Sequence, residues 1–146
     1  MRRANRSMLV PYTAEQMYKL AADVEAYPEF LPWCHRADVL LRDGEHVEAE
    51  LEMRRGSISK TFKTRNRLVE NSSITMSLLE GPFRKLDGHW EFTPLGDEGS
   101  KVSLDVEFAF DSRITDMLFG HFFEETCNRL VDAFTKRAEQ IYGSGQ

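Results

Sequence analysis

The stretch that decides the fold is VSLDVEFAF (102–110), followed shortly afterwards by FGHFFEETCNRLVDAFTKRAEQIYG (119–143). In the first part every second residue is apolar, which is the period of a strand with one buried face. In the second part apolar residues recur every three or four positions, which is the period of an amphipathic helix. The change of period predicts a sheet packed against a long C-terminal helix, because each element must bury its apolar face.

Upstream of this stretch the same two-residue alternation recurs in short runs separated by turn residues. An antiparallel meander is therefore expected, with about six strands joined by turns of a few residues. The runs lie at 5–10, 47–54, 58–67, 74–78, 85–92 and 102–110. Between the first two, Thr13 precedes a helical pattern with Gln16 at capping-box spacing. We expect the long helix to begin after a cap at Asp111 or Ser112 and to end at Gly143.

The predicted fold class is α+β, with one domain over residues 1–146 and a curved sheet of about six to seven strands around the helix. A sheet that curves round one helix can leave space between the two, and such a space is suited to a ligand. The run EGPFRKLDGHWEF (80–92) supports this prediction. Gly81-Pro82 should turn the chain between two strands, and Gly88 should leave room for a ligand or for the helix.

One hairpin is predicted in more detail, because its residues include an unusual lysine. A two-residue turn at Arg55-Gly56 would place residues whose numbers sum to about 111 opposite each other. Glu48 would then face Lys63, and Lys60 would face Leu51 on an apolar surface. A lysine there either reaches water at an edge or donates a hydrogen bond to a ligand.

Composition and charge narrow the class of protein. Hydrophobic residues make up 41% and charged residues 29%, as in ordinary globular domains, and the net charge is −5. The acidic total argues against a general nucleic-acid-binding protein. No apolar run approaches the ~20 residues of a membrane helix, and no secretory signal is recognisable. A cytoplasmic location is expected, with a peripheral position at the inner membrane as a second expectation. One segment without acids is basic: Arg54, Arg55, Lys60, Lys63, Arg65 and Arg67.

Catalytic and metal-binding motifs are not found in the sequence, so neither a catalytic residue nor a metal site is predicted. Cys34 and Cys127 have neither zinc-site nor disulfide spacing, and two reduced thiols are expected. His121 and Glu125 lie one helical turn apart. That spacing suits either acid–base chemistry or an ordinary surface pair, and the second is the more common arrangement.

Four segments resemble the START-like family of coenzyme Q-binding proteins, whose bacterial branch includes the ribosome association toxin A proteins. They are YPEFLPWC (27–34), GSISKTFKTRNRL (56–68), EGPFRKLDGHWEFTPL (80–95) and VDAFTKRAEQIYG (131–143). LVPYTAEQMYKL (9–20) is most similar to the toxin branch. The resemblance runs from about Asn5 to Gly143 and implies a helix-grip fold, in which the sheet and helix enclose a hydrophobic tunnel.

The resemblance also implies site residues. Pro32 and Trp33 would lie near the tunnel entrance, although the family does not always have a large residue at position 33. Further expected ligand-binding residues, from the resemblance and the strand pattern, are Lys60, Phe62, Phe83, Leu86, Gly88, Trp90, Phe119 and Phe122.

Three functions follow as expectations. The first is non-enzymatic binding of ubiquinone or a related isoprenoid lipid in support of respiration, with the lipid as ligand and no cofactor, and with transient contact with a membrane surface. The second is a toxin of a toxin–antitoxin system that binds the large ribosomal subunit, with RNA contacts from Arg55, Lys63, Arg65 and Arg67. The third is a cyclase-like enzyme, which is supported only by the fold of distant relatives.

Overall fold

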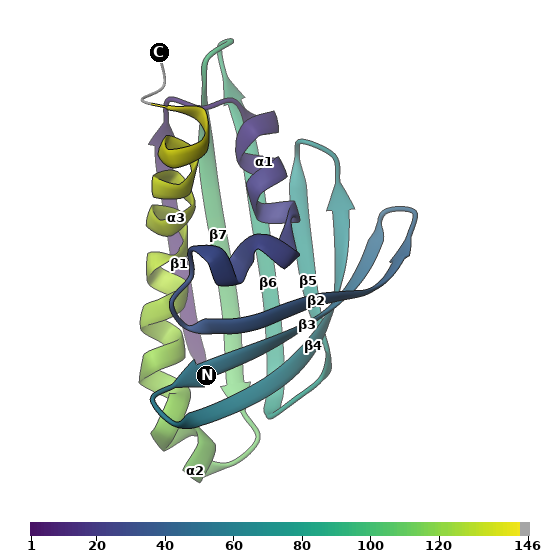
Figure 1. The fold of residues 1–146 in the computed structure, drawn as a ribbon, viewed down its shortest axis with the longest axis vertical. Helices are drawn as coiled ribbons and strands as arrows, with labels where there is room; N and C mark the ends of the chain where they lie inside the picture. Colours follow the sequence, from purple (N-terminus) through teal and green to yellow (C-terminus); the bar gives the residue numbers. More distant parts are fainter. Residues whose placement is uncertain (144–146) are drawn as a thin grey trace.

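The computed structural model describes residues 1–143, so the last three residues of the predicted domain lie outside it (Figure 1). One antiparallel sheet has the strand order β1-β7-β6-β5-β4-β3-β2. Its strands are β1 Arg2–Val10, β2 Cys34–Asp43, β3 His46–Arg55, β4 Ile58–Val69, β5 Ser73–Glu80, β6 Phe83–Leu95 and β7 Gly99–Phe110. The helices are α1 Ala14–Ala22, the 3-10 helix η1 Val24–Glu29, α2 Arg113–Thr115, the π-helix η2 Asp116–Gly120 and α3 His121–Tyr142.

The predicted α+β architecture is confirmed: β2 to β7 form a meander, β1 closes onto β7, and the long helix follows. The sequence pattern missed β2, for a reason that the structure makes clear. This strand lies at an edge of the sheet, and irregularities in its pairing with β3 fall at Cys34/Arg36 and Val39/Leu41. Such bulges interrupt the two-residue period on which recognition of a strand depends.

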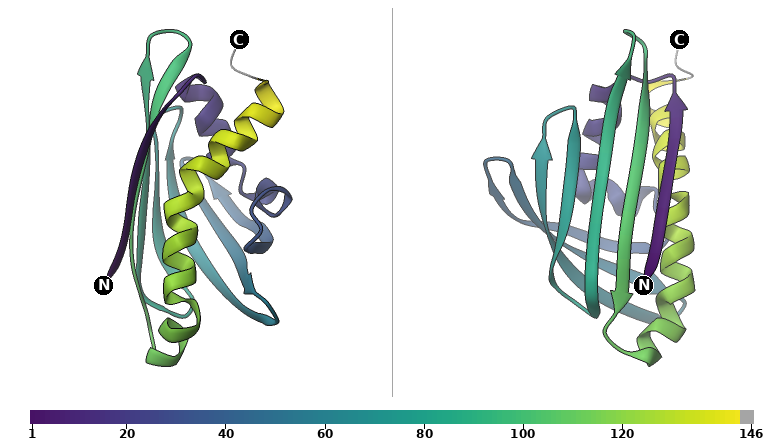
Figure 2. Two further views of the ribbon diagram at one scale, coloured as in Figure 1. Left: turned by 90° about the vertical axis from the view of Figure 1, so that its left-hand side faces the viewer. Right: turned by 180° about the vertical axis from the view of Figure 1, so that it is seen from behind.

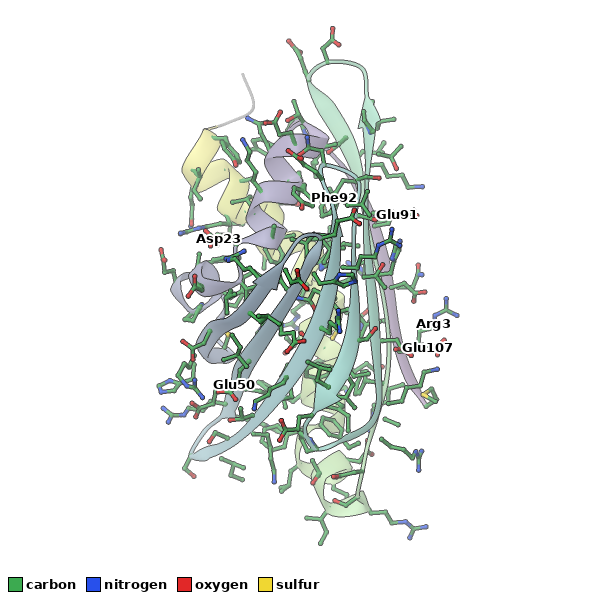
Figure 3. All side chains as sticks on the ribbon, turned by 90° about the vertical axis from the view of Figure 1, so that its right-hand side faces the viewer. Arg3, Asp23, Glu50, Glu91, Phe92 and Glu107 are labelled. Carbon is green, nitrogen blue, oxygen red and sulfur yellow. The ribbon has the colours of Figure 1, made fainter. Side chains whose placement is uncertain are left out.

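The sheet is strongly curved, and α3 lies in its concave side (Figure 2). Helix α3 packs against β1, β7 and α1, while β2, β3 and β4 curl round towards its other side. Further bulges, between Lys63 and Thr64 in β4 and between Phe83 and Lys85 in β6, accompany this curvature. The outer face is polar, and Arg3 and Glu107 project from it away from the helices (Figure 3).

The helix caps agree with the sequence pattern. Thr13 and Gln16 form a reciprocal capping box at the start of α1, which confirms that prediction. Of the two candidate caps for the C-terminal helical segment, Ser112 is the one used: its hydroxyl accepts a 3.1 Å hydrogen bond from the Thr115 amide. The helical path continues through η2 into α3, and Gly143 follows its end with φ +86°.

The register predicted for the β3–β4 hairpin is wrong: each residue of β4 pairs with the residue of β3 that lies two positions further along the chain than predicted. Arg55 pairs with Ile58, so the turn lies at Gly56-Ser57 rather than at Arg55-Gly56. Gly56 has φ +60°, which a tight hairpin turn requires at its first central position and which glycine adopts without strain. Consequently Lys60 faces Met53 instead of Leu51, and Lys63 faces Glu50 instead of Glu48. The shift is even, so each side chain keeps its predicted face.

Gly81-Pro82 forms the predicted turn between β5 and β6. Gly81 has φ +145°, and a Cβ there would lie 2.6 Å from the Cβ of Phe62, so both conformation and space require glycine. The Pro82 carbonyl accepts a 2.8 Å hydrogen bond from the Asp111 amide. This bond ties the turn to the segment that leads into α2.

Candidate functional site

An apolar cavity of about 80 Å³ lies between α3, η1 and the concave face of the sheet. Its wall comes from strands β3 to β7 on one side and from the middle of α3 on the other. The residues that line it are Val24, Tyr27, Trp33, Leu51, Phe62, Thr64, Asn66, Met76, Leu86, Gly88, Trp90, Val106, Phe123, Cys127, Leu130 and Phe134. We call this space the inner cavity.

The wall of the inner cavity carries no Asp, Glu, His, Lys or Arg side chain within the described residues. Its two weakly acidic groups are held in their neutral forms. Burial raises the pKa of the Cys127 thiol to about 12, and burial also raises the pKa of Tyr27 far above its usual value. The Tyr27 hydroxyl donates to the Ala21 carbonyl. Neither group is therefore a proton acceptor or nucleophile at neutral pH.

A second, larger pocket of about 340 Å³ adjoins the inner cavity, and we call it the vestibule. Its residues come from the segment before β2, from the β3–β4 hairpin and from α3: Leu31, Pro32, Trp33, Arg54, Arg55, Gly56, Phe122, Thr126, Arg129, Leu130 and Ala133. Trp33 and Leu130 line both spaces and therefore form the partition between them. Both side chains are only partly buried.

The structure brings most of the predicted ligand-binding residues to these two spaces. Trp33, Phe62, Leu86, Gly88 and Trp90 line the inner cavity, and Pro32 and Phe122 line the vestibule.

Three predicted residues lie elsewhere. Phe83 packs among other phenylalanines, with its ring stacked on Phe110 at 4.5 Å between centroids. Phe119 is fully buried beside Phe110. Lys60 is half-buried opposite Met53 and lines neither space.

The gap at Gly88 is filled by a neighbouring side chain rather than by the helix. A Cβ at Gly88 would lie 2.5 Å from the terminal methyl of Met76, its cross-strand partner on β5, and 3.7 Å from Val106. The nearest obstacle is thus the far end of a flexible side chain, which can move. Glycine at this position lets Met76 lie across the wall of the inner cavity.

Two polar residues of the wall, Thr64 and Asn66, are not among the residues predicted from the sequence. They follow Phe62 on the inward-facing side of β4, and both are buried. The signal was present, since the alternation that turns Phe62 inward also turns positions 64 and 66 inward. It is easy to miss because inward positions are expected to be apolar.

The basic residues proposed for RNA contact are distributed differently from what the sequence suggests. Arg55 donates a 2.6 Å hydrogen bond to the Leu118 carbonyl and lies over the Phe122 ring, so it joins the hairpin to the C-terminal helices. On the outer face, Lys63 pairs with Glu80 at 3.1 Å.

The two remaining members of that set also have acidic neighbours. Arg67 lies 3.9 Å from Glu45, and Arg65 is exposed opposite Glu48. The outer face of β4 is therefore largely neutralised.

The remaining candidates for catalysis or metal binding are weak. His121 is about 80% exposed, with its Nε2 3.6 Å from a Glu125 oxygen, and it lies on the surface rather than at the inner cavity. Both cysteines are free thiols, and burial raises the pKa of Cys34 to about 11. Within residues 1–143 no group of three or more potential ligands is placed to hold a metal ion.

Several large apolar side chains are exposed at the start of β4 and on the segment that precedes α3. Ile114 and Met117 are 72% and 81% exposed, and Leu118 and Ile58 are also exposed. Met117, Leu118 and Ile58 line a surface hollow together with Arg55 and Gly56, which also line the vestibule. We call Ile58, Ile114, Met117 and Leu118 the apolar rim. No helix in the described part of the chain is both long and apolar enough to cross a bilayer.

Comparison with known proteins identifies relatives over almost the whole chain. Residues 10–135 match the family described as polyketide cyclase/dehydrase and lipid transport. The ribosome association toxin RatA of Vibrio cholerae is 46% identical over 143 residues, which cover 98% of this chain and 99% of that protein. The mitochondrial coenzyme Q-binding protein COQ10 of Dictyostelium discoideum is 31% identical over 137 residues, which cover 91% of this chain and 67% of that protein.

Among solved structures, the Zhui aromatase/cyclase of Streptomyces sp. R1128 superposes with a TM-score of 0.85. The superposition covers 97% of this chain and 95% of that one, at 17% sequence identity. At that identity the likeness establishes the fold and carries no argument about activity.

Proposed function

This chain belongs to the polyketide cyclase/dehydrase and lipid transport family, and from that premise we propose that it binds an isoprenoid quinone or a similar lipid without transforming it. The observation that carries the proposal is the inner cavity, whose described wall is mostly apolar and free of charged side chains. Burial of apolar surface contributes roughly 25 cal/mol per Å², so a prenyl chain would bind without specific polar contacts. The COQ10 relative is named for binding coenzyme Q, which supports this ligand class.

An enzymatic role is less well supported. A cyclase needs groups that give and take protons at the substrate. In the inner cavity the candidates are Tyr27 and Cys127, and burial raises the pKa of both, so neither takes up a proton-accepting role near neutral pH. The Zhui aromatase/cyclase shares the fold, and a fold of this kind serves both binding and catalysis.

For a lipid to bind in the inner cavity, the partition of Trp33 and Leu130 between the inner cavity and the vestibule must open. The inner cavity, at about 80 Å³, is smaller than the ~300–1,000 Å³ of ordinary ligand pockets. The vestibule supplies a further 340 Å³ on the other side of Trp33 and Leu130. Rotation of these two partly buried side chains would join the spaces into one pocket of ordinary size. A ring or chain end would then lie in the inner cavity, with the rest of the lipid in the vestibule.

The apolar rim fits the step in which a lipid leaves a membrane. Met117, Leu118 and Ile58 line a hollow that shares Arg55 with the vestibule, and Arg113 precedes the exposed Ile114 in the sequence. Apolar side chains with arginines between them suit transient contact with an anionic bilayer surface. We therefore place the protein, when it loads, at the surface of a membrane.

The proposal is tested by lipid content and uptake. Protein purified from its native host is extracted, and the lipids are identified by mass spectrometry; a prenylated quinone in stoichiometric amount is expected. Delipidated protein is then mixed with vesicles that contain the quinone, separated from them by flotation, and assayed for quinone. A Met117→Glu variant should load more slowly and Glu125→Gln, on the exposed surface of α3, should load normally. Protein that emerges empty from both experiments would contradict the proposal.

Binding to the large ribosomal subunit is a second candidate, favoured by the RatA relative, which is named as a ribosome association toxin and matches almost end to end. The residues available for it are Arg65 and Arg67 on the outer face of β4. Glu48 and Glu45 reduce the positive potential around these two arginines. Co-sedimentation with purified large subunits, at low and high salt, tests this role. It should be lost in an Arg65→Glu, Arg67→Glu variant. No co-sedimentation at low salt would exclude this function.

A further inference from the structure

A buried amide without a partner faces the inner cavity. Asn66 on β4 is 5% exposed, and its Oδ1 atom has no hydrogen-bond partner among the described residues. Thr64, two residues earlier on the same face of the strand, is 4% exposed. Both side chains line the inner cavity, so this unpartnered buried oxygen lies in the wall of the candidate site.

The cross-strand neighbours of this amide cannot satisfy it. Across the sheet Asn66 pairs with Val47 on β3 and with Met76 on β5, and neither side chain donates a hydrogen bond. Thr64 similarly pairs with Ala49. A buried acceptor left unpaired costs free energy, and native proteins rarely leave one without a reason. Its position in the wall indicates that the missing partner comes from a ligand.

The hydrogen-bonding groups of Asn66 and Thr64 define the chemistry of that partner. An amide oxygen accepts a hydrogen bond, and a threonine hydroxyl both donates and accepts. A neutral hydroxyl on the ligand matches both groups. An anion would find no cation in the described wall of the cavity, and a plain hydrocarbon would leave the amide oxygen unpaired.

We propose that Asn66 and Thr64 form a recognition site for a hydroxyl group on the ring of an otherwise apolar ligand, such as a prenylated phenol or hydroquinone. This inference rests on the lipid-binding function proposed above and adds the chemical class of the head group. It predicts that ligands with a free ring hydroxyl bind more tightly than the same molecules with that hydroxyl methylated. It also predicts that fatty acids, whose carboxylates are charged, bind least well.

The test uses a geranylated phenol and its methyl ether as the two probes. Trp33 and Trp90 are the two tryptophans of the chain and both line the inner cavity, so quenching of their fluorescence reports occupancy. Delipidated wild-type protein should bind the phenol about tenfold more tightly than the ether, the ratio expected for one hydrogen bond. Asn66→Leu, a change of similar volume, should bind both probes with the affinity that the wild type has for the ether.

Two further variants keep the test decisive. Thr64→Val should reduce the preference in part, and it serves as the measured variant if Asn66→Leu does not fold. Thr61→Val, on the exposed outer side of the same strand, is the matched control and should keep the full preference.

The outcomes separate this inference from the function on which it rests. If the wild type binds neither probe, lipid binding itself is wrong. If it binds both probes equally, lipid binding stands and hydroxyl recognition is overturned. A preference that survives in both Asn66→Leu and Thr64→Val would also overturn the assignment of these residues.

Discussion

Two regions of the interior under α3 differ sharply, although the same helix and the same face of the sheet build both. In one region Phe83, Phe108, Phe110 and Phe123 pack ring against ring, with centroids 4.5–6.3 Å apart. We call it the aromatic cluster. The other region is the inner cavity, where the inward positions are held by Thr64, Asn66, Met76 and Gly88 and a space is left.

The difference lies in the residues that the strands supply. At the start of β6 and the end of β7 the inward positions are phenylalanines, which bury large areas and favour edge-to-face contacts. In the wall of the inner cavity, β4 supplies the polar Thr64 and Asn66, β5 supplies the flexible Met76, and β6 supplies Gly88, which has no side chain. The aromatic cluster is therefore the part that stabilises the fold, and the inner cavity is the part in which stability is given up for space.

The largest effect is expected in the aromatic cluster. Phe108 is fully buried and contacts Phe83, Phe110 and Phe123. Phe108→Ala should lower the free energy of unfolding by about 3–5 kcal/mol, because it leaves a cavity in packed surroundings. Chemical denaturation measures the loss. Phe122→Ala in the half-exposed vestibule is the comparison, and a loss of equal size there would contradict the division.

Filling the inner cavity should lower the free energy of unfolding less than Phe108→Ala does, but it should prevent ligand binding. Leucine at position 88 would have to displace the terminal methyl of Met76, which is mobile enough to yield. We expect Gly88→Leu to destabilise the protein by about 1–3 kcal/mol and to abolish quinone loading from vesicles. Denaturation and lipid analysis are run on the same preparation. Normal loading would show that the space at Gly88 serves another purpose.

Removing the unpartnered amide should raise the stability of the protein rather than lower it. Asn66→Leu is expected to stabilise delipidated protein by about 1 kcal/mol, because it relieves the burial of an unsatisfied oxygen. A thermal scan of both proteins without ligand measures the difference. A loss of stability would mean that the amide already has a structural partner, and it would weaken the distinction between the two regions.

The smallest effect is expected at the ion pairs that join β1 to the C-terminal helices. The Arg2 guanidinium donates to Asp116 at 3.0 and 3.1 Å and to Glu124 at 3.0 Å. Arg2→Met should cost less than about 1 kcal/mol, because these groups are partly exposed.

This small effect should depend on pH in a defined direction. The hydrogen bond from Arg2 lowers the pKa of Asp116 below its ordinary value of 3.8. The contribution of the pair is therefore present above that value and is lost as the pH falls through the lowered pKa. The stability difference between wild type and Arg2→Met should be constant near neutrality and shrink only in strong acid. A difference that disappears between pH 7 and 5 would implicate another group.

Much of the fold could be read from periodicity, because a buried face imposes the period of its element wherever the element is regular. The period predicted β7 and α3, and the spacing of Thr13 and Gln16 predicted the capping box. It failed at β2, where bulges interrupt the period, and at the hairpin, where the position of Gly56 within the turn set the register. Family resemblance supplied Trp33 and Pro32, which no pattern of spacing would have selected.

The sequence by itself determined the order of elements, the inward face of each strand and the apolar stripe of α3, since these depend on neighbours along the chain. Only the tertiary structure decided which inward residues surround a space and which pack solidly. Phe83 and Trp90 are both buried aromatic residues of β6, yet one joins the aromatic cluster and the other lines the inner cavity. The residues that other strands and α3 place around each of these side chains make that difference, and those residues are far apart in sequence.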